Sequence, residues 1–184
     1  MSDAETLDQA RAVLWSSRVL RRSLFDADGS TVGTVHDVLL APASASQAPT
    51  LRGFVVLVDR RNIFVHEARV DALDRDGVHL RGGTVDLRQF KKRPGELLVS
   101  EDIIGASTEF GPIADVGFVE SERAHGRWVI HEIAAGGGGR VRRRPVSTLP
   151  WSHVASRYVP DAVIGDLARL RDLHKADAAE AIQG

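Results

Sequence analysis

The 184-residue sequence contains no cysteine. This absence excludes a disulfide scaffold, a thiolate metal site and a cysteine nucleophile. No stretch approaches the roughly 18 apolar residues of a membrane-spanning helix, and the acidic N-terminus lacks the hydrophobic region of a signal peptide. We therefore expect a soluble, cytoplasmic protein with no membrane span.

An excess of charge of one sign is also missing. The net charge is −1, so no overall field would draw the protein to nucleic acid or to a membrane. Hydrophobic residues make up 43% of the chain and charged residues 27%, which is ordinary for a globular protein. A chain of this length holds one large domain or two small ones.

What the sequence does contain is an internal repeat. Residues 32–38 read VGTVHDV and residues 110–116 read FGPIADV. In both copies the apolar positions change parity just before the aspartate, which predicts a β-bulge there. We predict that Asp37 and Asp115 each accept a backbone N–H freed by the bulge, and that Gly33 and Gly111 belong to the same structural motif.

Short apolar strands follow each copy of the repeat. Residues 53–58 are apolar on both faces, as in a strand inside a closed barrel. Residues 65–70 and 149–154 match as equivalent ends of two modules, and the charged segment 91–96, with Pro and Gly, marks a boundary. We therefore predict a mainly β fold of two tandem small β-barrels, over residues 18–93 and 94–160.

Helical spacing of apolar residues predicts one helix at each end of the chain. The first covers residues 1–17 and the second covers residues 161–184. The second helix also fits the start of a truncated helical domain. Its apolar stripe makes it a candidate dimerisation element.

Candidate chemistry is sparse. Asp26-x-Asp28-Gly29 has the opening of a calcium loop but lacks the later oxygen ligands, so we interpret it as an acidic turn. The seven histidines form no H-x-x-x-H pair, and the four-glycine run 136–139 has no phosphate-loop Lys-Ser/Thr. The sequence thus predicts no catalytic residue, no cofactor and no metal ligand.

The sharpest cluster of charge is a candidate partner-binding strand. It consists of Arg140, Arg142, Arg143 and Arg144. In an extended strand, alternate arginines share one face and would contact phosphate, RNA or an acidic partner. The alternative is a solvated edge strand whose charge discourages edge-to-edge pairing. Two further basic groups lie at residues 60–61 and 91–93.

Several of these stretches resemble the PRC-barrel family. The resemblance is carried by residues 24–29 (LFDADG) with the first repeat, and by residues 52–56 (RGFVV). The family is a small closed β-barrel found in the H subunit of photosynthetic reaction centres and in a ribosome-maturation factor. The second copy departs from the pattern at Pro112 and Ala114, which implies a degenerate barrel.

A closer similarity is to soluble bacterial proteins in which tandem PRC barrels precede an MgtE-type intracellular helical domain and CBS domains. It is carried by residues 63–65 (IFV), by residues 87–90 with 93–99, and by residues 170–179 (LRDLHKADAA). The resemblance implies a non-enzymatic regulatory or adaptor region of an MgtE-like, magnesium-transport-related protein. It would act through docking of a protein partner or through self-association as a homodimer.

Two other functions remain open at the level of the sequence. The first is an RNA- or ribosome-associated module that uses the Arg140–Arg144 strand. The second is an enzyme or small-molecule carrier with a site between the two barrels, for which converging histidine and carboxylate side chains would be the signature.

Overall fold

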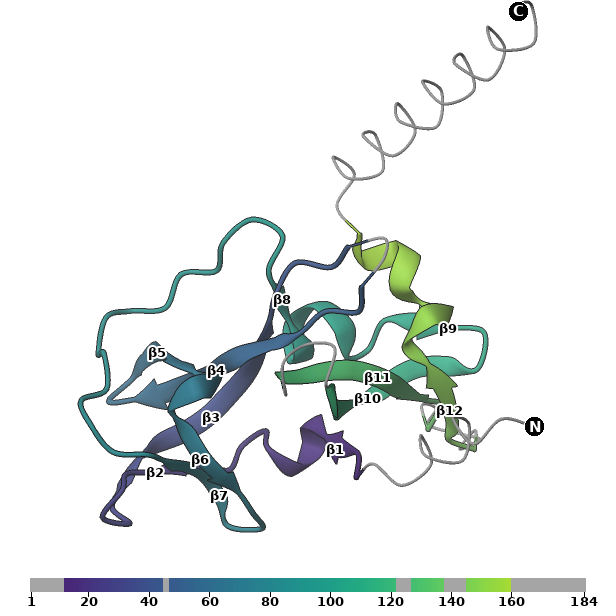
Figure 1. Ribbon diagram of the computed structural model, residues 1–184. Coiled ribbons are helices and arrows are strands. Elements are labelled where there is room, and N and C mark those ends of the chain that lie inside the picture. The colour runs from purple at the N-terminus through teal and green to yellow at the C-terminus, as the bar shows by residue number, and fades with distance from the viewer. Residues whose placement is uncertain (1–11, 45–46, 122–126, 138–144, 160–184) are drawn as a thin grey trace, which may run out of the picture.

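The computed structural model describes residues 12–44, 47–121, 127–137 and 145–159, and this part of the chain is mainly β, as predicted (Figure 1). Its strands form two sheets, one of seven strands and one of five. Within these residues no helix is long and apolar enough to cross a membrane.

The larger sheet is built mostly by the first module, the predicted domain over residues 18–93. Its strands are β2 (Ser23–Phe25), β3 (Thr31–Leu40), β4 (Leu51–Val58), β5 (Arg61–His66), β6 (Val70–Leu73), β7 (Gly77–Leu80) and β8 (Leu97–Leu98). The order is β5-β4-β3-β2-β7-β6, and β8 pairs with β3. A 3-10 helix, η3 (Glu67–Arg69), connects β5 to β6.

The smaller sheet is built mostly by the second module, the predicted domain that begins at residue 94. Its strands are β1 (Leu14–Trp15), β9 (Ser107–Thr108), β10 (Gly111–Ser121), β11 (Arg127–Ala135) and β12 (Ser147–Pro150). The order is β1-β10-β11-β12, and β9 pairs with β10. The helical turns around this sheet are η2 (Ser16–Arg18), the π-helix η4 (Val99–Ile103), η6 (Trp151–His153) and η7 (Ala155–Tyr158).

The prediction of closed barrels is corrected to open sheets. The edge strands β5 and β6 of the larger sheet meet at the corner made by η3, but no ladder of hydrogen bonds joins them. At this corner the imidazole Nδ1 of His66 accepts the N–H of Ala68 at 3.1 Å and caps η3. In the described part of the second module, no strands corresponding to β6 and β7 follow η6.

The β-bulges predicted beside the two aspartates are confirmed. The ladder between β3 and β4 shifts register between Val35 and Asp37, and the ladder between β10 and β11 shifts between Ile113 and Asp115. The N–H of the following residue donates to each carboxylate, at 2.7 Å for Asp37 and 2.8 Å for Asp115. Each aspartate therefore satisfies a backbone donor at its own bulge, as expected.

The two repeat glycines are required for different reasons. A Cβ on Gly33 would lie 2.4 Å from the carbonyl oxygen of Leu57, because β3 and β4 approach closely there. Gly111 has a φ of +120°, and its Cβ would lie 3.0 Å from Cα of Gly136. The ends of the modules also match as predicted, since β5 leads directly into η3 and β12 into η6.

Two short segments cross between the modules. The N-terminal strap, residues 14–17, precedes the first module and pairs with β10 of the second. The central strap, residues 97–100, precedes the second module and pairs with β3 of the first. The pairs are Leu14↔Phe118 and Trp15↔Gly117 for one strap, and Leu97↔Leu40 and Leu98↔Leu39 for the other.

The two straps pair with their partner strands in the same register, counted from the aspartate of each repeat. Phe118 lies three residues after Asp115, and Leu40 lies three residues after Asp37. The strap residues opposite them therefore occupy equivalent positions. The modules are related as two copies that exchange their leading segments.

The helix predicted over residues 1–17 is wrong in its described part. Residues 14–15 form β1, and residues 16–18 form a 3-10 turn. Pairing with β10 satisfies backbone groups of this segment, and that tertiary contact outweighs the helical spacing of its apolar residues. Residues 1–11 and the helix predicted over 161–184 lie outside the described residues.

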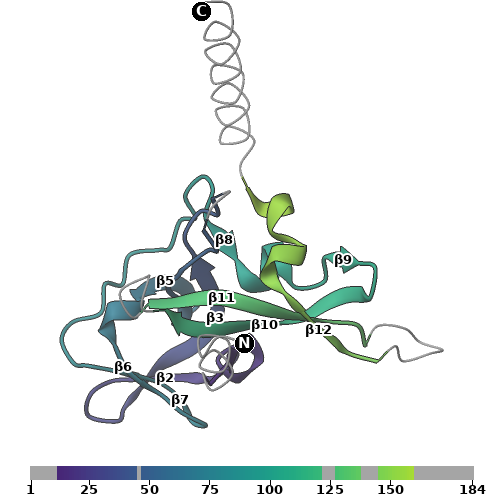
Figure 2. The same ribbon diagram turned by 45° about the vertical axis from the view of Figure 1, so that its right-hand side comes forward.

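A single apolar core joins the two modules. It includes Leu24 and Phe54 from the first module and Phe118 and Ile133 from the second, all almost completely buried. The N–H of Ile130 on β11 also donates to a backbone carbonyl just before β4, at 3.1 Å. Figure 2 shows the strands of the second sheet lying against those of the first.

Candidate functional site

The structure describes some of the predicted site residues and not others. The arginine strand Arg140, Arg142, Arg143 and Arg144 lies outside the described residues. Of the four motif residues, Asp37 and Asp115 lie at the bulges, and Gly33 and Gly111 lie four residues before them in β3 and β10. Of the remaining basic groups, residues 91–93 lie on the segment that connects the two modules.

Asp37 holds the central strap. Its Oδ1 accepts the N–H of Ser100 at 2.9 Å in addition to the N–H at its own bulge. The residue is only 4% exposed, and this burial raises the pKa of the Asp37 carboxyl above its ordinary value. The carboxylate is therefore occupied with backbone donors of both modules.

Asp115 holds the N-terminal strap in the equivalent way. Its Oδ1 accepts the N–H of Ser17 at 3.0 Å and the hydroxyl of Ser16 at 2.5 Å, and its Oδ2 accepts the hydroxyl of Ser17. Sequence reasoning placed both aspartates correctly but missed their strap partners. The available signal was a serine two residues after an apolar pair, in LWSS and in LLVS.

The acidic turn predicted at residues 26–29 is confirmed. Gly29 has a φ of +85°, and its N–H donates to the carbonyl of Asp26 at 3.0 Å. The carboxylate of Asp28 accepts the N–H of Ser30 at 2.8 Å. In the described stretches, no three His, Asp or Glu side chains lie close enough together to hold a metal ion.

The connecting segment, residues 86–97, carries several basic side chains and borders two cavities. Arg93-Pro94-Gly95-Glu96 makes a tight turn, with Gly95 at φ +82° and the N–H of Glu96 donating to the Arg93 carbonyl at 3.1 Å. Pro at the second position and Gly at the third favour this turn. The buried carboxylate of Glu96 accepts the N–H of Arg93 at 2.8 Å, which fixes the turn further.

Asp102 fastens this segment to the second module. Its Oδ2 lies 2.5 Å from Nζ of Lys92 and accepts the N–H of Leu98 at 2.6 Å. Asp102 thereby bonds both the connecting segment and the central strap. The connecting segment is held in place at Lys92, at its turn and at β8.

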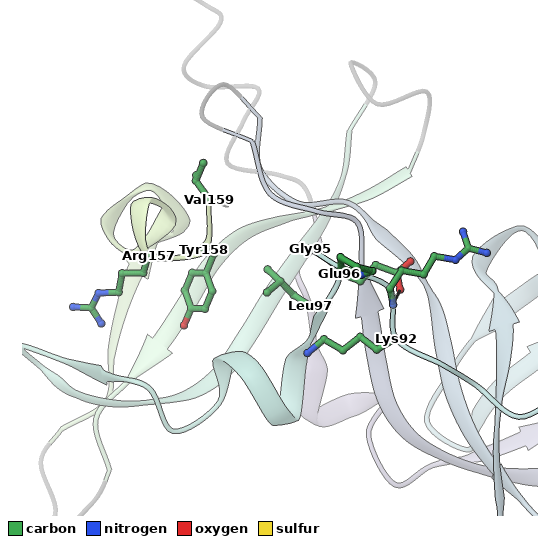
Figure 3. Close-up of a pocket in the computed structure, with 9 residues that line it drawn as sticks. Lys92, Gly95, Glu96, Leu97, Arg157, Tyr158 and Val159 are labelled. Carbon is green, nitrogen blue, oxygen red and sulfur yellow. Dashed lines mark hydrogen bonds between the residues drawn. The ribbon is translucent and has the colours of Figure 1, made fainter. Parts of the chain in front are cut away.

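A cavity lies on each side of the segment. One, of about 590 Å³, separates residues 92–97 from η7. Figure 3 shows the Tyr158 ring and the Leu97 side chain on opposite sides of this cavity, with Arg157 directed away from it. Burial raises the pKa of the Tyr158 hydroxyl, and its ring stacks on Trp151 with centroids 5.2 Å apart. This wall is therefore apolar with a protonated hydroxyl.

The second cavity, of about 500 Å³, lies between the segment and the outer face of the first sheet. Apolar side chains from both elements line it, namely Leu39, Phe64 and Phe90. Its rim is basic, with Arg52 from β4 and Arg88, Lys91, Lys92 and Arg93 from the segment. Arg88 is paired with Asp86 at 2.6 Å, and this side-chain bond lowers the pKa of the Asp86 carboxyl.

We define the linker surface as these two cavities and the segment between them. Its cations are Arg52, Arg88, Lys91, Lys92 and Arg93, and its carboxylates are Asp86, Glu96 and Asp102. Arg52, Lys91 and Arg93 form no ion pair with any other described residue. A local excess of positive charge therefore lies on a chain whose net charge is −1.

Sequence reasoning identified residues 91–93 as basic but missed Arg52 and the η7 wall. Arg52 reaches this surface because β4 lies beside β3, and residues 157–159 reach it because η7 follows the corner at η6. No spacing along the chain connects these positions to the segment. Comparison with protein-family models and with curated proteins gives no match for this chain.

Proposed function

We propose that the protein is a non-enzymatic docking module of regulatory or adaptor type, which binds an acidic segment of a protein partner at the linker surface. The observation that carries this proposal is the set of three unpaired cations, Arg52, Lys91 and Arg93, around a cavity with an apolar floor. Acidic side chains would pair with the rim, while apolar side chains between them would contact Phe64 and Phe90.

The rigidity of the surface supports docking. The turn at residues 93–96 and the bonds to Asp102 hold the segment before any partner arrives. A preorganised surface loses less conformational entropy on binding than a mobile one. The buried carboxylates in this region, on Asp37 and Glu96, already accept backbone N–H groups, which assigns them structural roles.

The test is binding of a fluorescent acidic probe, a glutamate-rich peptide with interspersed leucines, to the full chain. We expect saturable binding that weakens as salt rises, because the contacts are ionic. The double variant Lys91→Glu with Arg93→Glu should weaken binding by about tenfold or more, the effect of losing charge-assisted contacts. The matched control is Arg60→Glu with Arg61→Glu, in the hairpin between β4 and β5, because neither arginine lines either cavity of the linker surface.

Equal loss of binding in both double variants would contradict a specific surface and indicate general charge attraction. An RNA oligonucleotide forms the second arm. Tighter binding of RNA than of the peptide, lost in the same Lys91 and Arg93 variant, would overturn the protein partner in favour of the RNA-associated alternative. Absence of binding to either probe would overturn the linker surface as a docking site.

We also propose, on the sequence resemblance, that the modules are divergent relatives of tandem PRC barrels with open sheets, and that the chain is a regulatory region of an MgtE-like, magnesium-transport-related protein. The support is the repeat and its bulges, together with the similarity of residues 63–65, 87–90 and 93–99. In a parent protein with an MgtE-type domain, deletion of this region should change the magnesium response measured by titration calorimetry. An unchanged response would contradict regulation by this region.

A further inference from the structure

A separate cavity, away from the linker surface, lies beside the N-terminal strap. Its volume is about 440 Å³, and it lies where the strap and η2 face the hairpin of β6 and β7. Its apolar lining residues are Leu14, Val19 and Leu73. Its charged lining residues are Arg18, Arg22, Arg75 and Asp74. It shares no residue with the linker surface.

The three arginines lack partners among the described residues. Arg18, Arg22 and Arg75 have no side-chain hydrogen bond or ion pair to any of them. The one carboxylate of the cavity, Asp74, is engaged by Nε2 of His79 at 2.9 Å and by two N–H groups of its own turn, at 2.8 and 3.1 Å. The cavity therefore carries three guanidinium charges against one carboxylate.

Comparison of the two modules shows that the fold does not need arginine at these positions. The carbonyl of Arg22 accepts the N–H of Val35 at 2.8 Å, and the carbonyl of Ala106 accepts the N–H of Ile113 at 2.9 Å. Val35 and Ile113 are equivalent residues of the repeat, so Arg22 corresponds to Ala106. The same backbone turn thus forms in the second module without a guanidinium.

The preceding residue supports the same comparison. Arg21 donates its N–H to the carbonyl of Val35 at 2.9 Å, as Gly105 does to that of Ile113 at 2.7 Å. Both have positive φ, +64° for Arg21 and +86° for Gly105. Glycine is the residue suited to this conformation, so arginine at this position is strained. Arg21 is thus an arginine that its own backbone does not favour; it precedes Arg22 in the chain but does not line this cavity.

We propose that the cavity binds the phosphoryl group of a small molecule. Guanidinium groups present paired N–H donors that match the oxygens of a phosphate, and three of them surround one space. The apolar residues Leu14, Val19 and Leu73 would contact the organic part of the ligand. A volume of about 440 Å³ suits a small ligand rather than a macromolecule.

The experiment is a titration of the isotope-labelled full chain, followed by amide chemical shifts at constant ionic strength. The probes are inorganic phosphate and phenyl phosphate. We expect saturable shifts at residues 18–22 and 73–77, with tighter binding of phenyl phosphate because its ring contacts the apolar lining. Arg22→Gln and Arg75→Gln should each weaken binding by about tenfold or more, the loss of one charge-assisted contact.

The control variant is Arg61→Gln, an exposed arginine of β5 that lines none of the cavities described above, and it should bind as the wild type does. An unchanged amide spectrum outside the cavity shows that each variant is folded, and the Arg75 variant, in an exposed hairpin, provides the test if Arg22→Gln does not fold. Shifts that never saturate, or equal weakening in the Arg61 variant, would overturn the site. Equal affinity for the two probes would overturn the role of the apolar lining and assign the cavity to free phosphate.

Discussion

Asp37 and Asp115 are carboxylates whose partners are mostly backbone donors. Each accepts the N–H at its own bulge and the N–H of a strap serine. A buried N–H without an acceptor costs free energy. The carboxylate oxygen of each aspartate supplies that acceptor, and this is its structural role. The aspartates of the repeat thus belong to the architecture of the molecule.

The first prediction separates the acceptor role of Asp37 from its charge. Asp37→Ala leaves two N–H groups without a partner and should lower the free energy of unfolding by about 1–3 kcal/mol. Asp37→Asn keeps an acceptor oxygen and should cost about 1 kcal/mol or less. Urea unfolding measures both, with Asp76→Ala, an exposed side chain in a turn, as control. Equal losses in the two Asp37 variants would contradict the acceptor role.

The second prediction concerns pH. Burial raises the pKa of the Asp37 carboxyl in the folded protein above its ordinary value of 3.8, so the native state binds more protons than the unfolded state in the window above 3.8. The contribution of Asp37 to stability is therefore fully present below this window and is lost as pH rises through the folded pKa.

Urea unfolding of the wild type and of Asp37→Asn, from below pH 3.8 to neutrality, tests this sign. Asparagine does not titrate, so the wild type should lose stability relative to the variant as pH rises. The other shifted aspartates cancel in this comparison, including Asp74, whose pKa is lowered mainly by the N–H of Asp76. If the difference in unfolding free energy between the wild type and Asp37→Asn does not change with pH, burial does not raise the pKa of Asp37.

At the scale of elements, the two straps occupy equivalent positions but offer their aspartates different hydrogen-bond donors. The central strap offers Asp37 the N–H of Ser100, whereas the N-terminal strap offers Asp115 an N–H and two hydroxyls. The central strap runs into the π-helix η4, whereas the N-terminal strap runs into the 3-10 helix η2. An acidic pair, Glu101 and Asp102, lies in this wider turn, and Asp102 bonds the connecting segment.

The third prediction is that each aspartate protects the strap of the other module. Asp115→Ala should speed amide hydrogen exchange at residues 14–17, and Asp37→Ala should speed it at residues 97–100. Loss of these hydrogen bonds should raise local exchange by about fivefold or more, since each hydrogen bond contributes about 1 kcal/mol. Mass spectrometry of exchanged peptides measures this effect. Uniform acceleration over the whole chain would indicate global destabilisation instead.

At the scale of the whole molecule, the modules form one cooperative unit. Core residues of both modules belong to a single apolar cluster, and each module holds a strap of the other. The covalent connection between β7 and β8 is therefore only one of several links. A small module that shares its core also gains buried apolar area that it could not obtain alone.

The fourth prediction is that the modules stay associated after the connection is cut. A protease site inserted between Leu87 and Arg88 should be cleaved, because residues 86–89 are exposed. The two fragments should then co-elute in size-exclusion chromatography at the position of the intact chain. Separate elution of the fragments would contradict the shared core and the exchanged straps, and elution at twice the size would indicate the homodimer expected from the sequence.

Much of the local structure was predictable from the sequence. The parity change beside Asp37 and Asp115, the acidic turn ending at Gly29, and the matching corners at residues 65–70 and 149–154 depend on neighbours a few residues apart. Pleat parity and turn chemistry act over such distances, so the pattern was sufficient.

The helix expected at residues 14–17 shows where this reasoning stops. Ser16 bonds Asp115 across 99 residues of sequence, and β1 forms only because β10 is beside it. The same holds for the linker surface, where Arg52 joins Lys91 and Arg93, and for the cavity that brings Arg75 to Arg18 and Arg22. The sequence by itself determined the repeat, its bulges and its turns. Only the tertiary structure decided the strap exchange, the open sheets and the grouping of cations, because these depend on contacts between segments with no local signal in common.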